Sequence, residues 1–120
     1  MKKQQLPSPS GGTKECLNIN TDAGLIAQNG AVNLYWQGDG NLVLRDQVTS
    51  NALWDSKTGG KATDLCFQGD GNLVWHNNGV AIGSTRSNPT GEAMVMQADC
   101  NLVIYAGGGI PLWSSGTSCP

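Results

Sequence analysis

The sequence has few charged residues, few aromatic residues and no long apolar run. Only 13% of its 120 residues are charged and 6% are aromatic. No stretch approaches the roughly 20 consecutive apolar residues that a membrane-spanning helix needs, so we expect no membrane insertion. Nine acidic residues outnumber seven basic ones. The basic residues are scattered and form no cationic patch, so a nucleic acid is not an expected partner.

Residue groups that perform catalysis or bind metal ions are also scarce. His76 is the only histidine, and no Cys-x-x-Cys pair indicates a zinc site. Asp39-Gly-Asn41 and its counterpart at 70–72 resemble the start of a calcium-binding loop, but Val43 and Val74 stand where the third ligand is expected. No nucleophile elbow, phosphate loop or dinucleotide motif is present. We therefore expect no metal, no cofactor and no enzymatic activity, and we expect His76 to face solvent.

Glycine, in contrast, is abundant, with seventeen residues. Glycine weakens helices and serves turns that need a positive φ, so this composition predicts an all-β fold. The length fits one domain, which we place at residues 13–120. We interpret residues 1–12 as a flexible leader, because two lysines at its start are followed by no apolar stretch and therefore do not form an intact secretory signal.

Four widely spaced cysteines, Cys16, Cys66, Cys100 and Cys119, make two disulfides plausible. The alternative is four buried free thiols in a cytosolic protein, since cysteine is also a common core residue. Three pairings are possible. A secreted or extracellular location is the prediction, with the cytoplasm as the alternative.

One nine-residue motif occurs three times: QGDGNLVLR at 37–45, QGDGNLVWH at 68–76 and QADCNLVIY at 97–105. Each copy is followed by a second related segment, ALWDS at 52–56, VAIGS at 80–84 and PLWSS at 111–115. Chance similarity at such regular spacing is very improbable. The sequence therefore predicts three related structural units.

Polar and apolar positions alternate within each motif, which is the period of a β-strand. We expect the polar set to face outward and the apolar set to face a shared core, joined there by Trp54, Ile82 and Trp113. A unit of about 30 residues buries too little surface to fold alone, so three units should pack around one axis. Alternatively, the Asp and Asn residues only stabilise turns. The apolar set is Leu42, Leu44, Leu73, Trp75, Leu102 and Ile104.

The three motifs resemble the Gln-x-Asp-x-Asn-x-Val-x-Tyr pattern of the bulb-type mannose-binding lectins of monocots, over residues 16–119. The resemblance implies the β-prism II fold: three four-stranded antiparallel sheets with pseudo-threefold symmetry and tryptophans at the centre. It also implies a metal-free sugar pocket. In that pocket Asp and Asn bind the axial 2-hydroxyl of mannose, Gln reaches O3, Tyr reaches O4 and Val packs on the ring.

Only the third motif has the complete family pattern, because the tyrosine position holds Arg45 in the first motif and His76 in the second. We expect the third site to bind mannose best and the other two to be weakened, retuned or silent. The candidate carbohydrate-binding residues are Gln37, Asp39, Asn41, Val43 and Arg45; Gln68, Asp70, Asn72, Val74 and His76; and Gln97, Asp99, Asn101, Val103 and Tyr105.

The resemblance favours one disulfide pairing, Cys66 with Cys100 and Cys16 with Cys119. It also implies that Trp54 and Trp113 are buried, whereas Trp36 could be either a core residue or an exposed platform for a sugar. A homodimer, formed by exchange of C-terminal strands, is expected on the resemblance alone.

Two functions fit these observations. The first is a lectin for mannose or mannose-rich glycans and glycoproteins, and the complete third motif favours it. The second is a prism scaffold without sugar binding, acting as a protein-interaction, storage or antibacterial module. The two altered tyrosine positions favour the second.

Overall fold

The computed structural model describes residues 5–7 and 14–120, which form twelve β-strands and no helix. Within these residues there is consequently no helix long and apolar enough to cross a membrane. The strands are β1 (Gln5–Pro7), β2 (Lys14–Asn18), β3 (Gly24–Gln28), β4 (Val32–Trp36), β5 (Leu42–Asp46), β6 (Ala52–Asp55), β7 (Asp64–Gln68), β8 (Leu73–Asn77), β9 (Val80–Ser84), β10 (Gly91–Met96), β11 (Leu102–Ala106) and β12 (Ile110–Ser114).

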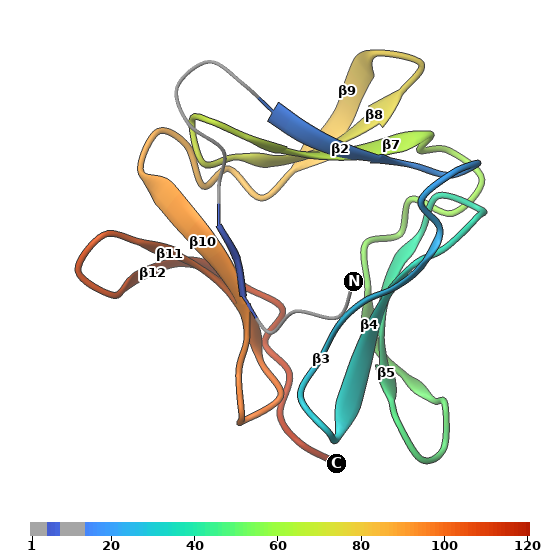
Figure 1. The fold of residues 1–120 in the computed structure, drawn as a ribbon, viewed down its shortest axis with the longest axis vertical. Coiled ribbons are helices and arrows are strands. Elements are labelled where there is room, and N and C mark those ends of the chain that lie inside the picture. Colours follow the sequence, from blue (N-terminus) through green and yellow to red (C-terminus); the bar gives the residue numbers. More distant parts are fainter. Residues whose placement is uncertain (1–4, 8–13) are drawn as a thin grey trace.

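The strands form three four-stranded antiparallel sheets around a common centre (Figure 1). Their orders are β3-β4-β5-β6, β2-β7-β8-β9 and β1-β10-β11-β12. Each nine-residue motif runs into the third strand of its sheet, at β5, β8 and β11. The all-β, three-sheet architecture expected from the sequence is confirmed.

The N-terminal region contributes to a sheet. Gln5–Pro7 form β1, which pairs antiparallel with β10. This part of the predicted leader is therefore a strand of the domain, which the sequence did not reveal because three residues give too short a pattern. The rest of the predicted leader, residues 1–4 and 8–12, lies outside the described residues.

Apolar side chains from all three sheets form one core. Leu44, Leu73 and Ile104 are each at most 2% exposed. Trp36 is completely buried, so it is a core residue and not a sugar platform, and Trp75 is buried as expected. Trp54 and Trp113 are only half-buried, and their rings meet edge to face with centroids 5.4 Å apart.

The last strand of each sheet contains a bulge that shifts its register. Leu44 pairs with Trp54 and Ile104 pairs with Trp113, but the corresponding partner of Trp75 is Gly83. The expectation that Ile82 occupies the position of the two tryptophans is therefore wrong by one residue. Ile82 is 42% exposed and lies in the bulge. Matching segments by sequence alone cannot detect such a one-residue shift.

The disulfides are Cys16–Cys66 and Cys100–Cys119. Two disulfides were expected, but the favoured pairing was wrong. Cys16 and Cys66 are register partners on the adjacent strands β2 and β7. The sequence does not show that these strands are neighbours, because they lie far apart in the chain and the pairing is set only by the sheet order.

The residue between Asp and Asn in each motif has a left-handed backbone, with φ of 87° at Gly40, 86° at Gly71 and 71° at Cys100. A Cβ at Gly71 would overlap the backbone of Gly91, where β10 begins. A Cβ at Gly40 would likewise overlap the backbone of Ala62, just before β7. These two motif turns therefore pack directly on the backbone of the next sheet.

We expect Gly71→Ala to destabilise the protein by about 1–3 kcal/mol, because the new methyl group adds a steric overlap to an unfavourable φ. Gly79→Ala is the matched control. Gly79 also has a φ of 86°, but a Cβ there meets no atom within 4 Å. Urea unfolding of both variants measures the difference, and equal losses would contradict the close packing of the motif turn.

Candidate functional site

Each motif consists of a tight turn followed by a strand, not of one continuous strand as expected. In the third motif, Gln97 N donates to Asn101 O at 3.0 Å, and Cys100 N donates to Gln97 O at 3.0 Å. The strand β11 begins only at Leu102. The other two motifs have the same turn, with Gln N to Asn O distances of 2.9 Å. The left-handed residue before Asn makes this turn possible.

The motif aspartates stabilise these turns and still have acceptor capacity. In every motif one carboxylate oxygen of Asp accepts the backbone N–H of Asn at 3.0 Å. Asp39, Asp70 and Asp99 are all exposed, and Oδ2 of each has no hydrogen bond with the described residues. The turn interpretation and the binding interpretation are thus compatible, because each uses a different oxygen.

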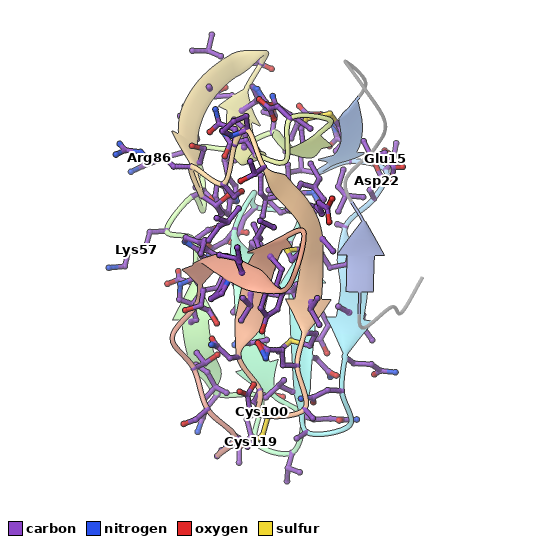
Figure 2. The ribbon with its side chains drawn as sticks, turned by 90° about the vertical axis from the view of Figure 1, so that its left-hand side faces the viewer. Glu15, Asp22, Lys57, Arg86, Cys100 and Cys119 are labelled. Atoms are coloured by element: carbon purple, nitrogen blue, oxygen red, sulfur yellow. A yellow bond between two sulfur atoms is a disulfide. The ribbon has the colours of Figure 1, made fainter. Side chains whose placement is uncertain are left out.

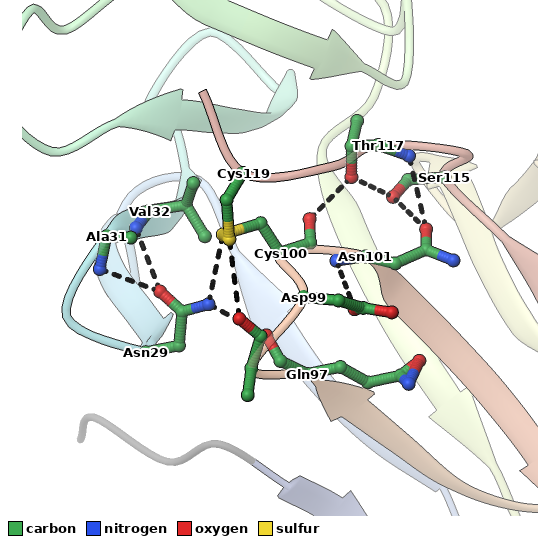
Figure 3. The surroundings of a disulfide bond; sticks show 11 residues. Asn29, Ala31, Val32, Gln97, Asp99, Cys100, Asn101, Ser115, Thr117 and Cys119 are labelled. Atoms are coloured by element: carbon green, nitrogen blue, oxygen red, sulfur yellow. Dashed lines mark hydrogen bonds between the residues drawn. A yellow bond between two sulfur atoms is a disulfide. The ribbon is translucent and has the colours of Figure 1, made fainter.

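In the third motif, the orientation of the Asn101 amide is fixed by the C-terminal segment. Asn101 Oδ1 accepts from Ser115 Oγ at 3.1 Å and from Thr117 N at 3.2 Å (Figure 3). It also accepts from Gly116 N at 2.9 Å. Asn101 Nδ2 has no partner among the described residues. The amide oxygen is therefore used for structure, while the N–H groups remain available to a ligand.

Gln97 and Tyr105 form the other end of this third site. The Tyr105 hydroxyl donates to Gln97 Oε1 at 3.1 Å. This bond leaves Gln97 Nε2 free to donate and the phenol oxygen free to accept. Val103 is only 3% exposed, so its contribution to an apolar contact with a ligand is small. The site is a polar surface of outward donors and acceptors.

The turn of the third site is clamped from two sides, a feature that the sequence did not reveal. The Cys100–Cys119 disulfide joins the turn to the chain end, and Thr117 Oγ1 donates to Cys100 O at 2.6 Å (Figure 3). From the neighbouring sheet, Asn29 Nδ2 donates to Gln97 O at 2.7 Å. Figure 2 shows Cys100 and Cys119 together at one end of the molecule.

The first site has the same turn, but both of its amides already donate a hydrogen bond to a carboxylate. Asn41 Nδ2 donates to Asp55 Oδ2 at 2.9 Å. In the third sheet the position of Asp55 is taken by Ser114, because Val43 pairs with Asp55 as Val103 pairs with Ser114. One of the two N–H groups of this amide, both free at the third site, is therefore already bonded here.

Arg45 also uses groups of the first site. With the Gln37 amide in the orientation that satisfies its neighbours, Nε2 donates to Asp39 Oδ1 at 3.2 Å and Oε1 accepts from Arg45 Nη2 at 3.0 Å. Arg45 Nη1 donates to Ser50 O at 2.9 Å. The first site therefore has fewer hydrogen-bonding groups free for a ligand than the third site, where Gln97 and Tyr105 bond only to each other.

An open hollow of about 740 Å³ lies beside the first site, and its walls include Gln37, Asp39 and Arg45. Tyr35 lines it as well, opposite Val43 on the adjacent strand. Tyr35 precedes the motif, so the sequence pattern did not mark it as a candidate. Its phenol stands on a different strand from the tyrosine position of the motif.

Among the described residues, the second site retains free N–H groups on the Gln68 and Asn72 amides, but its ninth residue is buried, whereas Arg45 and Tyr105 are half-buried. Asn72 Oδ1 accepts from Ser87 N at 3.3 Å, and its Nδ2 has no partner among the described residues. His76 is only 9% exposed, so the expectation that it faces solvent was wrong. Strands β7 and β9 flank it, with Asp64 and Ala81 opposite, and its Nδ1 has no hydrogen-bond partner in the described structure.

No group of three or more potential metal-ligating side chains occurs in residues 5–7 and 14–120. The polar groups of the candidate sites are carboxylates, amides, a phenol, a guanidinium and the imidazole of His76. Recognition by hydrogen bonds to neutral hydroxyl groups is the chemistry that these groups can perform.

No family sequence model matches the chain, and no curated protein sequence matches it. Solved structures do. A monomeric monocot mannose-binding lectin from Gastrodia elata is 30% identical, with a TM-score of 0.75 over 97% of this chain and 99% of that chain. The mannose-specific agglutinin from snowdrop (Galanthus nivalis) is 28% identical, with a TM-score of 0.67 over 98% of this chain and 100% of that chain.

Similarity also extends to a lectin named for Marasmius oreades, which is 29% identical with a TM-score of 0.74 over 96% of this chain and 92% of that chain. These relatives are lectins, which bind carbohydrate and catalyse no reaction. Three observations indicate the same family. They are the three sheets, the three Gln-x-Asp-x-Asn-x-Val turns and the 30% identity across almost the full length of both chains. This chain, a non-enzymatic carbohydrate-binding protein with the β-prism II fold, belongs to the bulb-type, monocot mannose-binding lectin family.

Proposed function

We propose that this lectin binds mannose or mannose-containing glycans without a metal ion, and that the third site provides most of the affinity. The observation that supports this best is the set of unused groups at that site. Three polar groups have no partner among the described residues: Asn101 Nδ2, Gln97 Nε2 and Oδ2, the outer carboxylate oxygen, of Asp99. Each lies beside a group that is fixed by the fold.

The chemistry of these groups suits one epimer of a hexose. A sugar hydroxyl both donates and accepts, so a carboxylate oxygen next to an amide N–H can satisfy it in both directions. The axial 2-hydroxyl of mannose points differently from the equatorial one of glucose. Because Asp99 and Asn101 are fixed in position, they can bind only one of these two orientations, and we propose that it is the axial 2-hydroxyl of mannose. Because the Asn101 amide is already ordered, little side-chain entropy is lost on binding.

A scaffold without sugar binding is the second candidate, and it has support at the other two sites. Asn41 and Gln37 are engaged by Asp55, Asp39 and Arg45. His76 is buried and cannot replace the half-buried phenol of Tyr105. We propose that the first and second sites are weak or silent for mannose. A protein-interaction, storage or antibacterial role is the second candidate for these two surfaces.

Calorimetric titration with methyl α-mannoside, with and without EDTA, tests the proposed function. We expect weak binding that is unchanged by the chelator, because the third site uses only protein groups. Methyl α-glucoside, the 2-epimer, is the control ligand and should give no measurable heat. Binding lost in EDTA, or equal binding of the two epimers, would refute the mechanism.

The first site offers a test by restoration. In an Asp99→Ala background, Asp55→Ser should release Asn41 Nδ2, and Arg45→Tyr should release Gln37 and supply a phenol. We expect the combined variant to gain mannose binding of about 1–3 kcal/mol, from two or more restored hydrogen bonds. Calorimetry measures the gain. Lys57→Ser, which changes an exposed residue two positions after Asp55, is the matched control and should restore no mannose binding.

We further propose a secreted or extracellular location, supported by the two disulfides, which persist in oxidising compartments. Glycoproteins with mannose-rich glycans are the proposed partners there. The homodimer stays a prediction from the family resemblance. In the described structure β12 pairs with β11 of the same chain, and Ile110 on its outer end is 59% exposed.

A further inference from the structure

The three sheets do not contribute equally to the centre of the molecule. Trp54 and Trp113 occupy equivalent register positions on β6 and β12, and their rings pack edge to face. The equivalent position on β9 is Gly83, which pairs with Trp75. Two indoles are therefore present where the arrangement of the sheets has room for three.

A hollow of about 470 Å³ lies beside Gly83, which stands where the other two sheets have a tryptophan. Trp54, Trp113 and Trp75 line it together with Gly83 and Ile82. A Cβ built at Gly83 meets no atom within 4 Å, so the space above this glycine is not filled by another side chain. Trp75 is the one residue of the three nine-residue motifs that lines the hollow, so the hollow is separate from the three motif turns.

The walls of the hollow combine aromatic surface with positive charge. Lys57 and Lys61 both line it, are exposed, and have no ion pair among the described residues. Asp55 is the one acidic residue of the lining, and its carboxylate accepts the Asn41 amide at 2.9 Å. Trp75 is 5% exposed and its Nε1–H has no hydrogen-bond partner in the described structure.

We propose that this hollow binds a small aromatic carboxylate. The ring of the ligand takes the space of the third indole, where it contacts Trp54 and Trp113, because aromatic rings add edge-to-face and stacking attraction to the burial of apolar surface. The carboxylate meets the ammonium groups of Lys57 and Lys61, which complement its charge. The two lysines outnumber the one carboxylate of the lining, so the local charge favours an anion.

Titration of the wild-type protein with indole-3-acetate, followed by calorimetry, tests the proposal. We expect saturable binding with one ligand per chain. The neutral analogue indole-3-acetamide should bind at least about tenfold more weakly, because it retains the ring and loses the charge. Acetate alone should not bind. Absence of saturable binding of indole-3-acetate up to millimolar concentration would overturn the proposal.

Two kinds of variant locate the binding. Gly83→Trp should fill the hollow and abolish binding of indole-3-acetate while leaving mannoside binding at the third site unchanged, which also reports that the variant is folded. Gly83 does not have a positive φ, so the backbone accepts a larger residue there. Wild-type affinity in Gly83→Trp would refute the assignment.

The double variant Lys57→Gln/Lys61→Gln changes only exposed side chains and tests the charge separately. We expect its affinity for indole-3-acetate to fall to that of the neutral amide. Arg86→Gln is the matched control, because it removes an exposed cation that does not line the hollow. A loss of affinity in Arg86→Gln equal to that in the lysine variant would show a general charge effect and overturn the role of the two lysines.

Discussion

Replacing Asp99 by alanine is expected to abolish measurable binding of methyl α-mannoside. The outer oxygen of Asp99 is the charged acceptor of the third site, and loss of a hydrogen bond to a charged group costs about 1.5–3 kcal/mol. This loss lowers the affinity by about 10- to 150-fold. Because the site is shallow and its affinity is already weak, the remaining affinity is too low for calorimetry to measure. Titration of the folded variant, checked by circular dichroism, measures the effect.

Two controls separate binding from turn stability. Asp99→Asn retains an oxygen that can accept the Asn101 N–H, as Asp99 Oδ1 does at 3.0 Å, but it removes the charge. We expect this variant to keep its thermal stability and still to lose most of its affinity. Asp39→Ala makes the same change as Asp99→Ala at the first site, where Asn41 is already bonded, and should leave the affinity nearly unchanged. The reverse order of the two alanine variants would contradict the ranking of the sites.

Removal of the Cys100–Cys119 disulfide is expected to lower both stability and mannoside affinity. The disulfide closes a loop with a sequence separation of 19, which corresponds to about 3 kcal/mol of chain entropy in the unfolded state. It also anchors the segment whose Ser115, Gly116 and Thr117 bond to Asn101 Oδ1. When this segment is released, the Asn101 amide can rotate, and the donor N–H is no longer directed outward.

The double variant Cys100→Ser/Cys119→Ser should therefore unfold at lower urea concentration and bind mannoside several-fold more weakly. Cys16→Ser/Cys66→Ser is the matched control. Its disulfide spans a separation of 50, worth about 4 kcal/mol by the same relation, but it joins β2 and β7 away from the third site. That variant should lose at least as much stability and keep its mannoside affinity. Equal losses of affinity would show that Cys100–Cys119 has no specific role in the site.

Much of the fold could be predicted from the sequence because the same pattern occurs three times. Leu42 and Leu44 stand at alternate positions between Asn41, Val43 and Arg45, a spacing that identifies a strand, and both leucines are fully buried. The resemblance of the motifs then specifies the three-sheet architecture. The prediction of a strand is wrong for the first half of each motif, because Gly40, Gly71 and Cys100 adopt left-handed backbone conformations that make a turn there.

Features that depend on neighbours in space were not predictable. Burial of His76 follows from the strands on both sides of β8, and the Cys16–Cys66 pairing follows from the neighbouring positions of β2 and β7. The contact of Asp55 with Asn41 depends on the register of β6 against β5. A bulge in β9 puts Gly83, and not Ile82, opposite Trp75. None of these contacts leaves a periodic signal in the chain.

A nuclear magnetic resonance titration of the uniformly ¹⁵N-labelled protein with methyl α-mannoside tests the central claim most directly, because it observes every site in one experiment. We predict that the side-chain N–H signals of Asn101 and Gln97 and the backbone N–H signal of Tyr105 shift at the lowest sugar concentrations. The corresponding signals of Asn41, Gln37 and Arg45 should shift later or not at all. Shifts that begin at Asn41 and Gln37, or an absence of shifts at Asn101 up to saturating sugar, would contradict the account.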